Sequence, residues 1–434
     1  MNDLKKLTFI ATGDAFITRR FPEGGYAGFG EIQDVISRHD VKFSNLEMTF
    51  HNSEGTPAAV SGGTWAMAEP RCLDDMKSYG FNLFTTANNH SGDYGEGGVL
   101  ATIRHLKERD MVFSGTGANL AEASRACYLE TQKARVALVS ACSTFHISDI
   151  AGGQSGEITG RPGLNPLRFN TTYHVTEPYF NMVKELAELT YVNAYEDYGI
   201  KLGYGNPKPE GVTNFGSHNF SLDSENKICV IPAERDMVRI EDEIREAKRQ
   251  ADIVLVSIHT HETDKDDFAT PASFLESFSK RCIDAGAQVV IGHGPHELRG
   301  IELYNNGIIL YSLGNFIFET ETVSVQPYEA YGNKGMPVDT KVGAYMDKRS
   351  KNGTVGYPTQ ENIWRSVMAG WTVEDGRVTQ MQLYPISLGM NAPRSQRGVP
   401  VLAHDSGVLA YLAELSKPFG TVIRIENNVG YIEL

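Results

Sequence analysis

Short apolar runs alternate with amphipathic stretches along most of this chain. The runs at Val136 to Ala141 and Ile253 to Ile258 are apolar or small throughout, as in strands that are buried on both faces. From Gly97 to Glu108, by contrast, apolar residues recur at the spacing of an amphipathic helix. The alternation predicts an α/β protein built from βαβ units. Further strands are expected at 7–12, 41–46, 81–87, 288–292, 301–304, 308–313, 365–373 and 378–385, and further helices at 31–38, 70–79, 120–125, 238–250, 272–285 and 409–415.

Two segments depart from this alternation. Residues 146–227 are rich in glycine and proline around one expected helix at 183–193, and residues 319–361 also have a loop-like sequence. A long irregular segment inside a compact domain is usually a lid or a binding loop. We therefore expect the segment at about 146–227 to cover the functional cleft and to contribute to substrate specificity.

The composition limits the possible partners. The 434 residues carry a formal net charge of −14, and no block of Lys or Arg forms a basic stripe, which argues against nucleic acid or an anionic membrane as the partner. The chain shows neither an apolar signal segment at its start nor a run long enough to span a bilayer, so we expect a cytoplasmic protein with no membrane span. Its five scattered cysteines form no C-x-x-C pair and are expected to be reduced thiols.

Five polar motifs follow apolar runs and therefore stand at the expected carboxyl ends of strands. In open α/β sheets, this is where ligands bind. Asp, Glu, Asn and His together offer oxygen and nitrogen ligands, which suit Zn, Mn or Fe and the activation of water for hydrolysis. The motifs therefore predict a metallohydrolase. They are Gly13-Asp14, Asn45-Leu46-Glu47, Asn88-Asn89-His90, His259 and Gly292-His293-Gly294-Pro295-His296.

The string from Thr85 to Gly95 carries the strongest signal. Its amides, imidazole and carboxylate would each cost about 1 to 3 kcal/mol if they were buried without partners, so we expect a function to hold them there. Asn89 is expected to supply a neutral metal oxygen. His90 is expected to act as a general acid or to orient an oxyanion, with Asp93 fixing its tautomer.

The remaining histidines differ in their expected roles. His259 ends a very apolar strand and is a better ligand candidate than His261, which we expect to point elsewhere on a continuing extended backbone. His293 and His296 flank a Gly-Pro turn and can reach the same ion or neighbouring ions. These two strand ends therefore supply most of the expected nitrogen ligands.

An acidic protein that binds an anionic substrate needs local positive charge. Arg19, Arg161 and Arg168 are the candidates, and the last two lie in a stretch that glycine and proline restrict. The alternative for each arginine is a structural ion pair. Asn88 and Glu262 are further candidates for substrate binding.

In their order and spacing, the motifs resemble the CapA (poly-γ-glutamate capsule synthesis protein) family, which is similar to the calcineurin-like metallophosphoesterases. The resemblance covers nearly the whole chain and implies a four-layer α/β/β/α sandwich of the metallophosphoesterase type. One domain is then expected over 1–320, including the inserted segment at about 146–227, and residues 321–434 add a loop region and C-terminal strands to the same sandwich. Three further sequence strings support the resemblance to this family: Tyr311-Ser312-Leu313-Gly314-Asn315-Phe316, Gly160-Arg161-Pro162-Gly163-Leu164-Asn165-Pro166-Leu167-Arg168 and Leu415-Ser416-Lys417-Pro418-Phe419-Gly420-Thr421.

The resemblance also implies a site for one or two divalent ions, Mn, Zn or Fe. The chain departs from the phosphoesterase pattern, because Phe16 stands where those enzymes have a histidine and Glu47 where they have the bridging aspartate. The first ion therefore lacks an imidazole, and we expect it to be weak, absent or completed by water or substrate. The implied ligands are Asp14 and His296 for the first ion, Asn89, His259 and His293 for the second, and Glu47 between the two.

The expected function is a metal-dependent hydrolase, in which metal-activated water attacks a γ-glutamyl or related amide bond of an anionic small molecule or polymer that resembles poly-γ-glutamate. His90 is expected to protonate the leaving group. Two alternatives stay open: a metallophosphoesterase, and a non-catalytic accessory or binding protein of bacterial capsule or exopolymer biosynthesis. The sequence leaves the oligomeric state open.

Overall fold

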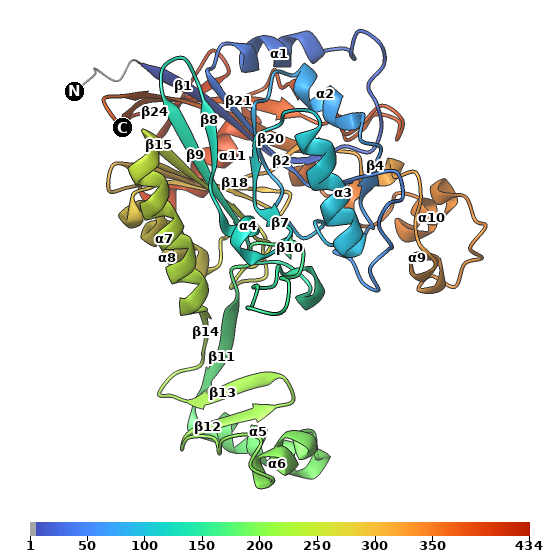
Figure 1. Ribbon diagram of the computed structural model, residues 1–434, viewed down its shortest axis with the longest axis vertical. Coiled ribbons are helices and arrows are strands. Elements are labelled where there is room, and N and C mark those ends of the chain that lie inside the picture. Colours follow the sequence, from blue (N-terminus) through green and yellow to red (C-terminus); the bar gives the residue numbers. More distant parts are fainter. Residues whose placement is uncertain (1–5) are drawn as a thin grey trace. The chain divides into compact units, whose positions relative to one another are not determined.

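The computed structural model describes residues 6–434 and contains two compact units (Figure 1). The larger unit runs to Leu167 and resumes from Met237 to Leu434, and the smaller unit is Arg168–Asp236. Both units mix helices with strands. The chain is therefore an α/β protein, as the alternation of apolar and amphipathic segments predicts.

A ten-stranded sheet of the larger unit has β1 (Leu7–Phe16) near its middle. β1 pairs in parallel with β2 and antiparallel to β20, and its register shifts on both sides of Asp14. Such irregularities bend a strand and re-aim its side chains. The strand order is β23 (Ile423–Glu426), β24 (Val429–Ile432), β21 (Arg377–Ser387), β20 (Arg365–Glu374), β1, β2 (Val41–Leu46), β5 (Leu83–Thr85) and β6 (Phe113–Ser114), with β19 (Asn315–Phe318) beside β1 and β22 (Val401–Leu402) beside β21.

A six-stranded sheet forms the second major layer of the larger unit. Its four central strands are parallel, and antiparallel strands pair with the outer two. In this register His259 lies directly beside His293, because both end neighbouring parallel strands. The strand order is β17 (Leu298–Tyr304), β18 (Gly307–Leu313), β16 (Val289–His293), β15 (Ile253–His259), β9 (Arg135–Cys142) and β8 (Cys127–Glu130).

The two sheets share one apolar core. Phe9 and Phe43 of the ten-stranded sheet belong to the same buried cluster as Leu138 and Leu255 of the six-stranded sheet. Phe9 also stacks on Trp371, with ring centroids 5.1 Å apart. Each fully buried side chain of this size contributes roughly 1.5 to 3 kcal/mol, so this core fixes the sheets that carry the site.

Helices pack against both sheets on faces other than this core. Ile32 of α1 (Phe29–Ser37) and Leu73 of α2 (Cys72–Ser78) join Ile10 of β1 in a second buried cluster. α8 (Ser273–Ala285) buries Phe274 and Phe278 and contacts β16 and β18. The other helices of the larger unit are α3 (Gly95–Lys107), α4 (Leu120–Ser124), α9 (Tyr328–Gly332), α10 (Val342–Arg349) and α11 (Gly407–Ser416), while α7 (Glu234–Gln250) begins at the end of the smaller unit.

The prediction that residues 319–361 are loop-like is wrong in detail. This stretch contains α9, α10 and two turns of 3₁₀ helix, and a third such turn begins at Glu361; all are too short for the apolar periodicity of a long helix. Within residues 6–434, no helix combines the length and the apolar character that a membrane crossing needs. The remaining short elements are β3 (Thr49–Phe50) with β4 (Met67–Ala68), β7 (Thr116–Gly117) with β10 (Gly163–Leu164), and the 3₁₀ turns η1 (Ile147–Asp149), η2 (Thr320–Thr322), η3 (Tyr357–Thr359), η4 (Glu361–Trp364) and η5 (Lys417–Phe419).

The smaller unit corrects the expectation of an irregular segment at 146–227. Residues up to Leu167 belong to the larger unit, where Leu167 N–H donates to Cys142 O at 2.7 Å. The rest forms a four-stranded sheet with two helices, whose strands are mostly half-exposed and so lack the apolar runs that identify buried strands. Its elements are β11 (Phe169–Val175), α5 (Glu177–Thr190), α6 (Ala194–Lys201), β12 (Val212–Phe215), β13 (His218–Leu222) and β14 (Lys227–Pro232), in the sheet order β12-β13-β11-β14.

Candidate metal centre

Asp14 is fixed at the irregular end of β1. Its Oδ1 accepts a hydrogen bond from Asn45 Nδ2 at 2.7 Å, and its Oδ2 accepts one from the Gly294 N–H at 3.0 Å. Burial raises the pKa of this carboxyl group to about 7, although both hydrogen bonds lower it. The preceding Gly13 is required by space, because a Cβ there would lie 1.8 Å from Gly314 O.

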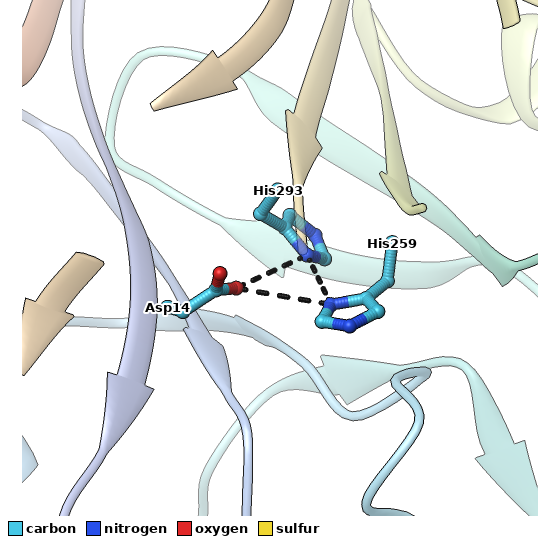
Figure 2. A group of neighbouring side chains, drawn as sticks. All are labelled: Asp14, His259 and His293. Atoms are coloured by element: carbon cyan, nitrogen blue, oxygen red, sulfur yellow. Dashed lines mark hydrogen bonds and ion pairs between the residues drawn. The ribbon is translucent and has the colours of Figure 1, made fainter. Parts of the chain in front are cut away.

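Asp14, His259 and His293 form the first group of candidate ligands (Figure 2). Asp14 Oδ1 lies 3.4 Å from His293 Nδ1 and 3.8 Å from His259 Nδ1, and the two Nδ1 atoms lie 2.9 Å apart. Around a tetrahedral zinc ion with bonds of about 2.0 to 2.1 Å, ligand atoms are roughly 3.3 Å apart. The three atoms therefore have the spacing of ligands that share one ion.

Glu47, His261 and His296 form the second group. Glu47 Oε1 lies 3.7 Å from His259 Nε2, and Glu47 Oε2 lies 3.9 Å from His296 Nδ1. Both oxygens of Glu47 are buried without a hydrogen-bond donor. Burial, together with the negative charges of Asp14 and Asp93, raises the pKa of Glu47 well above its ordinary value.

His261 lies in this group, and the expectation that it points elsewhere is wrong. Its Nε2 lies 3.1 Å from His259 Nε2. The extended backbone of β15 ends at His259, and the next residues bond across the site, with Thr260 N–H donating to His293 O and His261 N–H to Thr144 Oγ1. Because the strand does not continue, its alternation of sides does not apply to His261.

The grouping also differs from the one that the family resemblance implies. His296 was expected beside Asp14, yet its ring also lies beside Glu47 and His261, with ring centroids of His261 and His296 5.4 Å apart. His296 Nδ1 remains 3.7 Å from Asp14 Oδ2 and 2.9 Å from Asn315 Oδ1. The two groups are thus contiguous, and His296 lies between them.

The four imidazoles are held in the neutral form. Burial lowers the pKa of His293 to about 3 and that of His296 to about 4, and it lowers the pKa values of His259 and His261 well below the ordinary value. A neutral imidazole keeps one nitrogen lone pair for a metal, whereas an imidazolium has none. The rings therefore present acceptor atoms beside two buried carboxyl groups.

His90 lies at the edge of the second group. Its Nδ1 is 2.7 Å from Asp93 Oδ2, which also accepts the Ala66 N–H at 2.6 Å, and its Nε2 is 4.0 Å from Glu47 Oε1. The edge of Phe16 meets the ring at 86°, with centroids 5.2 Å apart. Phe16 thus packs against the ring of His90.

The two asparagines before His90 have different surroundings. Asn88 Nδ2 donates to Leu46 O at 2.8 Å and to Asn45 Oδ1 at 3.2 Å, so Asn88 ties its loop to the end of β2. Asn89 Oδ1 is buried and has no hydrogen-bond partner. This oxygen is free to accept a cation, and the role of Asn89 as a metal ligand stays a prediction.

The other residues expected at the substrate have partners of their own. Arg19 Nε donates to Glu319 at 2.8 Å, and Arg161 Nε donates to Ile150 O at 3.0 Å. Arg168 forms a two-pronged pair with buried Asp236, each bond 2.7 Å long. The carboxylate of Glu262 accepts hydrogen bonds from the hydroxyl groups of Ser143, Thr144 and Thr260. Substrate binding by these residues stays a prediction.

The sequence reasoning assigns no role to three residues that support the site. Ser257 Oγ lies 2.6 Å from His293 Nε2, Asn45 holds Asp14, and Asn315 contacts His296. Ser257 stands two residues before His259 and thus on the same side of β15, which is a signal that the strand pattern contains. Such partners fix the tautomer and orientation of a ligating ring.

An α/β protein with a buried centre of carboxylates and neutral imidazoles is the class that this fold and site define. The chain belongs to the family of the bacterial capsule synthesis protein PGA_cap, whose family model matches residues 8–320.

Known proteins resemble the chain to different extents. An uncharacterized protein of Sinorhizobium fredii is 33% identical over 454 aligned positions, which cover 100% of this chain and 94% of that protein. The capsule biosynthesis protein CapA of Bacillus anthracis is 24% identical, over 73% of this chain and 60% of its own length. The crystal structure of a hypothetical protein from Thermus thermophilus has 12% identity and a TM-score of 0.38, over 88% of this chain and 98% of that one.

Proposed function

We propose that this protein is a metal-dependent hydrolase of the CapA type, which holds one or two divalent ions in the two ligand groups. Mn, Zn and Fe suit a mixed set of imidazole and carboxylate ligands. Asn89 adds a neutral oxygen. The proposal includes a four-layer α/β/β/α sandwich, which is supported by the core that the two sheets share and by the helices packed against each sheet.

The buried carboxylate of Glu47, which has no hydrogen-bond donor, carries this proposal. A buried charge without compensation is strongly unfavourable, and a carboxyl group in such a place must be protonated or meet a cation. The rings of His259 and His296 face it as neutral acceptors and therefore do not neutralise it. A divalent cation satisfies the carboxylate and the ring nitrogens at once, so the residues fit a metal.

A divalent ion in this centre supplies Lewis-acid polarisation of a carbonyl or phosphoryl oxygen and lowers the pKa of water. The chain's own contribution is the placement of groups around it. Asp93 engages Nδ1 of His90, which leaves Nε2 directed toward the ligand groups, and from there a ring protonated at both nitrogens would donate a proton to a leaving group. Phe16 limits the rotation of that ring.

The proposed substrate is a γ-glutamyl or related amide of an anionic molecule. The support is family membership, because the CapA proteins of Bacillus anthracis and Bacillus subtilis are described as capsule and PGA biosynthesis proteins. Amide hydrolysis uses the same elements, namely a polarised carbonyl and a protonated leaving nitrogen.

The test is a parallel screen with defined metal content. The protein is stripped with a chelator, reloaded with Mn, Zn or Fe, and assayed for metal per chain and for hydrolysis of γ-glutamyl peptides and phosphodiesters. We expect metal-dependent amide hydrolysis that His259→Ala abolishes together with bound metal. The matched control is His218→Ala, an exposed histidine in β13 of the smaller unit.

Two other results would assign the alternatives. Turnover of phosphodiesters without turnover of the peptides would make the protein a metallophosphoesterase. Tight metal binding without turnover of either substrate would indicate an accessory or binding protein.

A further inference from the structure

Residues of the stretch between β19 and β20 line a cavity of about 180 Å³. This is several times the ~30 Å³ that one water molecule occupies in the liquid, so the cavity has room for a substituent of a substrate. Tyr357 forms one of its walls, and the ring centroid of Tyr357 lies 5.9 Å from that of His296 at 80°. A single side chain thus separates the cavity from the ligand groups.

Tyr357 contacts both the cation of the cavity and the ligand groups. The guanidinium carbon of Arg349 lies 6.0 Å from the centre of its ring. The ring of His296 meets the same ring at 80°. Tyr357 is therefore the side chain that connects the cavity with the candidate metal centre.

Arg349 lines this cavity and has no carboxylate partner among residues 6–434. It ends α10, is half-buried, and donates from Nη1 to Thr64 Oγ1, and no acidic group in residues 6–434 lies within ion-pair distance of it. Arg394 and Arg397, by contrast, both pair with Glu321, which also lines the cavity. In a protein with a net charge of −14, a half-buried guanidinium without an anion is a candidate binding group.

One short loop connects this arginine with the metal centre. A Cβ on Gly62 would lie 2.4 Å from Asn89 Nδ2, and a Cβ on the next residue, Gly63, would lie 3.4 Å from Arg349 Nη2. The loop therefore passes close to both side chains. The two consecutive glycines thus lie between Arg349 and Asn89, which is an expected metal ligand.

We propose that this cavity binds a carboxylate of the substrate through Arg349, next to the bond that the metal centre cleaves. The inference rests on the proposed function and deepens it, because it assigns the substrate class as amides that carry a free carboxylate, such as γ-glutamyl peptides. A planar guanidinium binds a carboxylate through two parallel hydrogen bonds, and partial burial reduces the screening of that pair by salt. The ring of Tyr357, which forms one wall of the cavity, then directs the adjoining amide group of the substrate toward His296 and Glu47.

The test measures binding without requiring turnover. Calorimetric titration compares the dipeptide γ-glutamylglutamate with its fully amidated form, which has no carboxylate, on metal-stripped and on metal-loaded protein. For the acid form, we expect Arg349→Gln to weaken binding at least about tenfold in both states, and the preference for acid over amide to disappear. Lys348→Gln removes the same charge from an exposed neighbour on α10 and should change binding less than about twofold.

The outcomes separate this inference from the proposed function. Binding that depends on Arg349 but is followed by no hydrolysis in any metal form would reject the hydrolase and keep the carboxylate site. Hydrolysis with unchanged affinity and acid preference in Arg349→Gln would reject the site and keep the hydrolase. Absence of dipeptide binding by the wild-type protein would also overturn the inference. Metal per chain in Arg349→Gln, compared with wild type, shows that the variant has kept its centre.

Discussion

Ser257 Oγ and His293 Nε2 lie 2.6 Å apart between neighbouring parallel strands, so the serine fixes the ring whose other nitrogen faces Asp14 and His259. A group that orients a ligating imidazole is commonly worth 10- to 100-fold in metal affinity. The relationship yields the first prediction.

We expect Ser257→Ala to lower metal affinity about 10- to 100-fold while the protein stays folded. Competition with a chelating dye measures the change. Ser140→Ala is the matched control, because Ser140 pairs with Ser257 in the sheet register and its buried hydroxyl has no hydrogen-bond partner. Equal affinity in the two variants would show that the serine does not orient the ring.

His261 gives the second prediction, which reverses the expectation from sequence. Nε2 of His261 lies in the group with Glu47 and His296, so His261→Ala should lower the metal content of the protein. We expect the same loss from His293→Ala, which removes a ligand of the first group. Elemental analysis after dialysis measures both. Metal content equal to that of His218→Ala would exclude His261 as a ligand.

The buried carboxyl of Asp14 makes the stability of the metal-stripped protein depend on pH. Burial raises its folded-state pKa from 3.8 to about 7, so the folded state binds a proton that the unfolded state has lost. The contribution of the Asp14 carboxyl group to stability is complete below pH 3.8, its pKa in the unfolded state. This contribution is lost as the pH rises through the folded-state pKa of about 7. Between these values, Asp14 lowers the free energy of unfolding by about 1.4 kcal/mol per pH unit.

Urea unfolding of the stripped protein between pH 4.5 and 7 tests this, with pH values set at roughly half-unit steps. Asp14→Asn should remove this contribution, since an amide does not titrate, so the slope of the variant should exceed that of the wild type by about 1.4 kcal/mol per pH unit. The buried histidines, whose pKa values are lowered, contribute a slope of the opposite sign in both proteins. Metal should reverse the sign of the Asp14 contribution, because binding requires the deprotonated carboxylate. Equal slopes in the variant and in the wild type would assign the pH dependence to other groups.

His90 and Asp93 are expected to act in turnover and not in metal binding. His90→Ala should lower kcat about 10²- to 10⁴-fold, and Asp93→Asn should lower it by less, because it disturbs only the tautomer of the ring. Steady-state kinetics and metal per chain are measured together. Parallel loss of metal and of kcat would place His90 among the ligands.

Variants of Arg168 and Arg161 test whether these two residues bind substrate or make structural contacts. Arg168→Ala removes two hydrogen bonds to the buried Asp236 and should destabilise the smaller unit by about 1 to 3 kcal/mol. Arg161→Ala removes one bond to a backbone oxygen and should cost less. A rise in KM for an anionic substrate with unchanged stability would instead support the clamp.

Several residues of the candidate centre could be expected together from the sequence, for a physical reason. Parallel strands of one sheet end at the same edge, so polar residues after apolar runs, such as His259 and His293, are brought together by the fold itself. Asp14 and Glu47 follow the same rule on the ten-stranded sheet. Once strands are located, the ligand groups follow from their ends.

The same logic fails where the backbone leaves the strand. His261 lies past the end of β15, and its direction is set by hydrogen bonds to Thr144 and across to His293 that no local pattern encodes. The strands of the smaller unit are half-exposed and short, so their apolar periodicity is too weak to identify them. Arg349 is separated from the strand-end motifs in sequence and reaches the site only through tertiary packing.

His259 turns its two nitrogens to different neighbours, with Nδ1 toward Asp14 and Nε2 toward Glu47. A neutral imidazole has only one lone pair to give, because the other nitrogen carries the proton. Two ions would therefore compete for this one ring, and the second to arrive must do without it or displace its proton. Stepwise metal titration should then show unequal affinities, with one resident ion and one that exchanges readily with the medium.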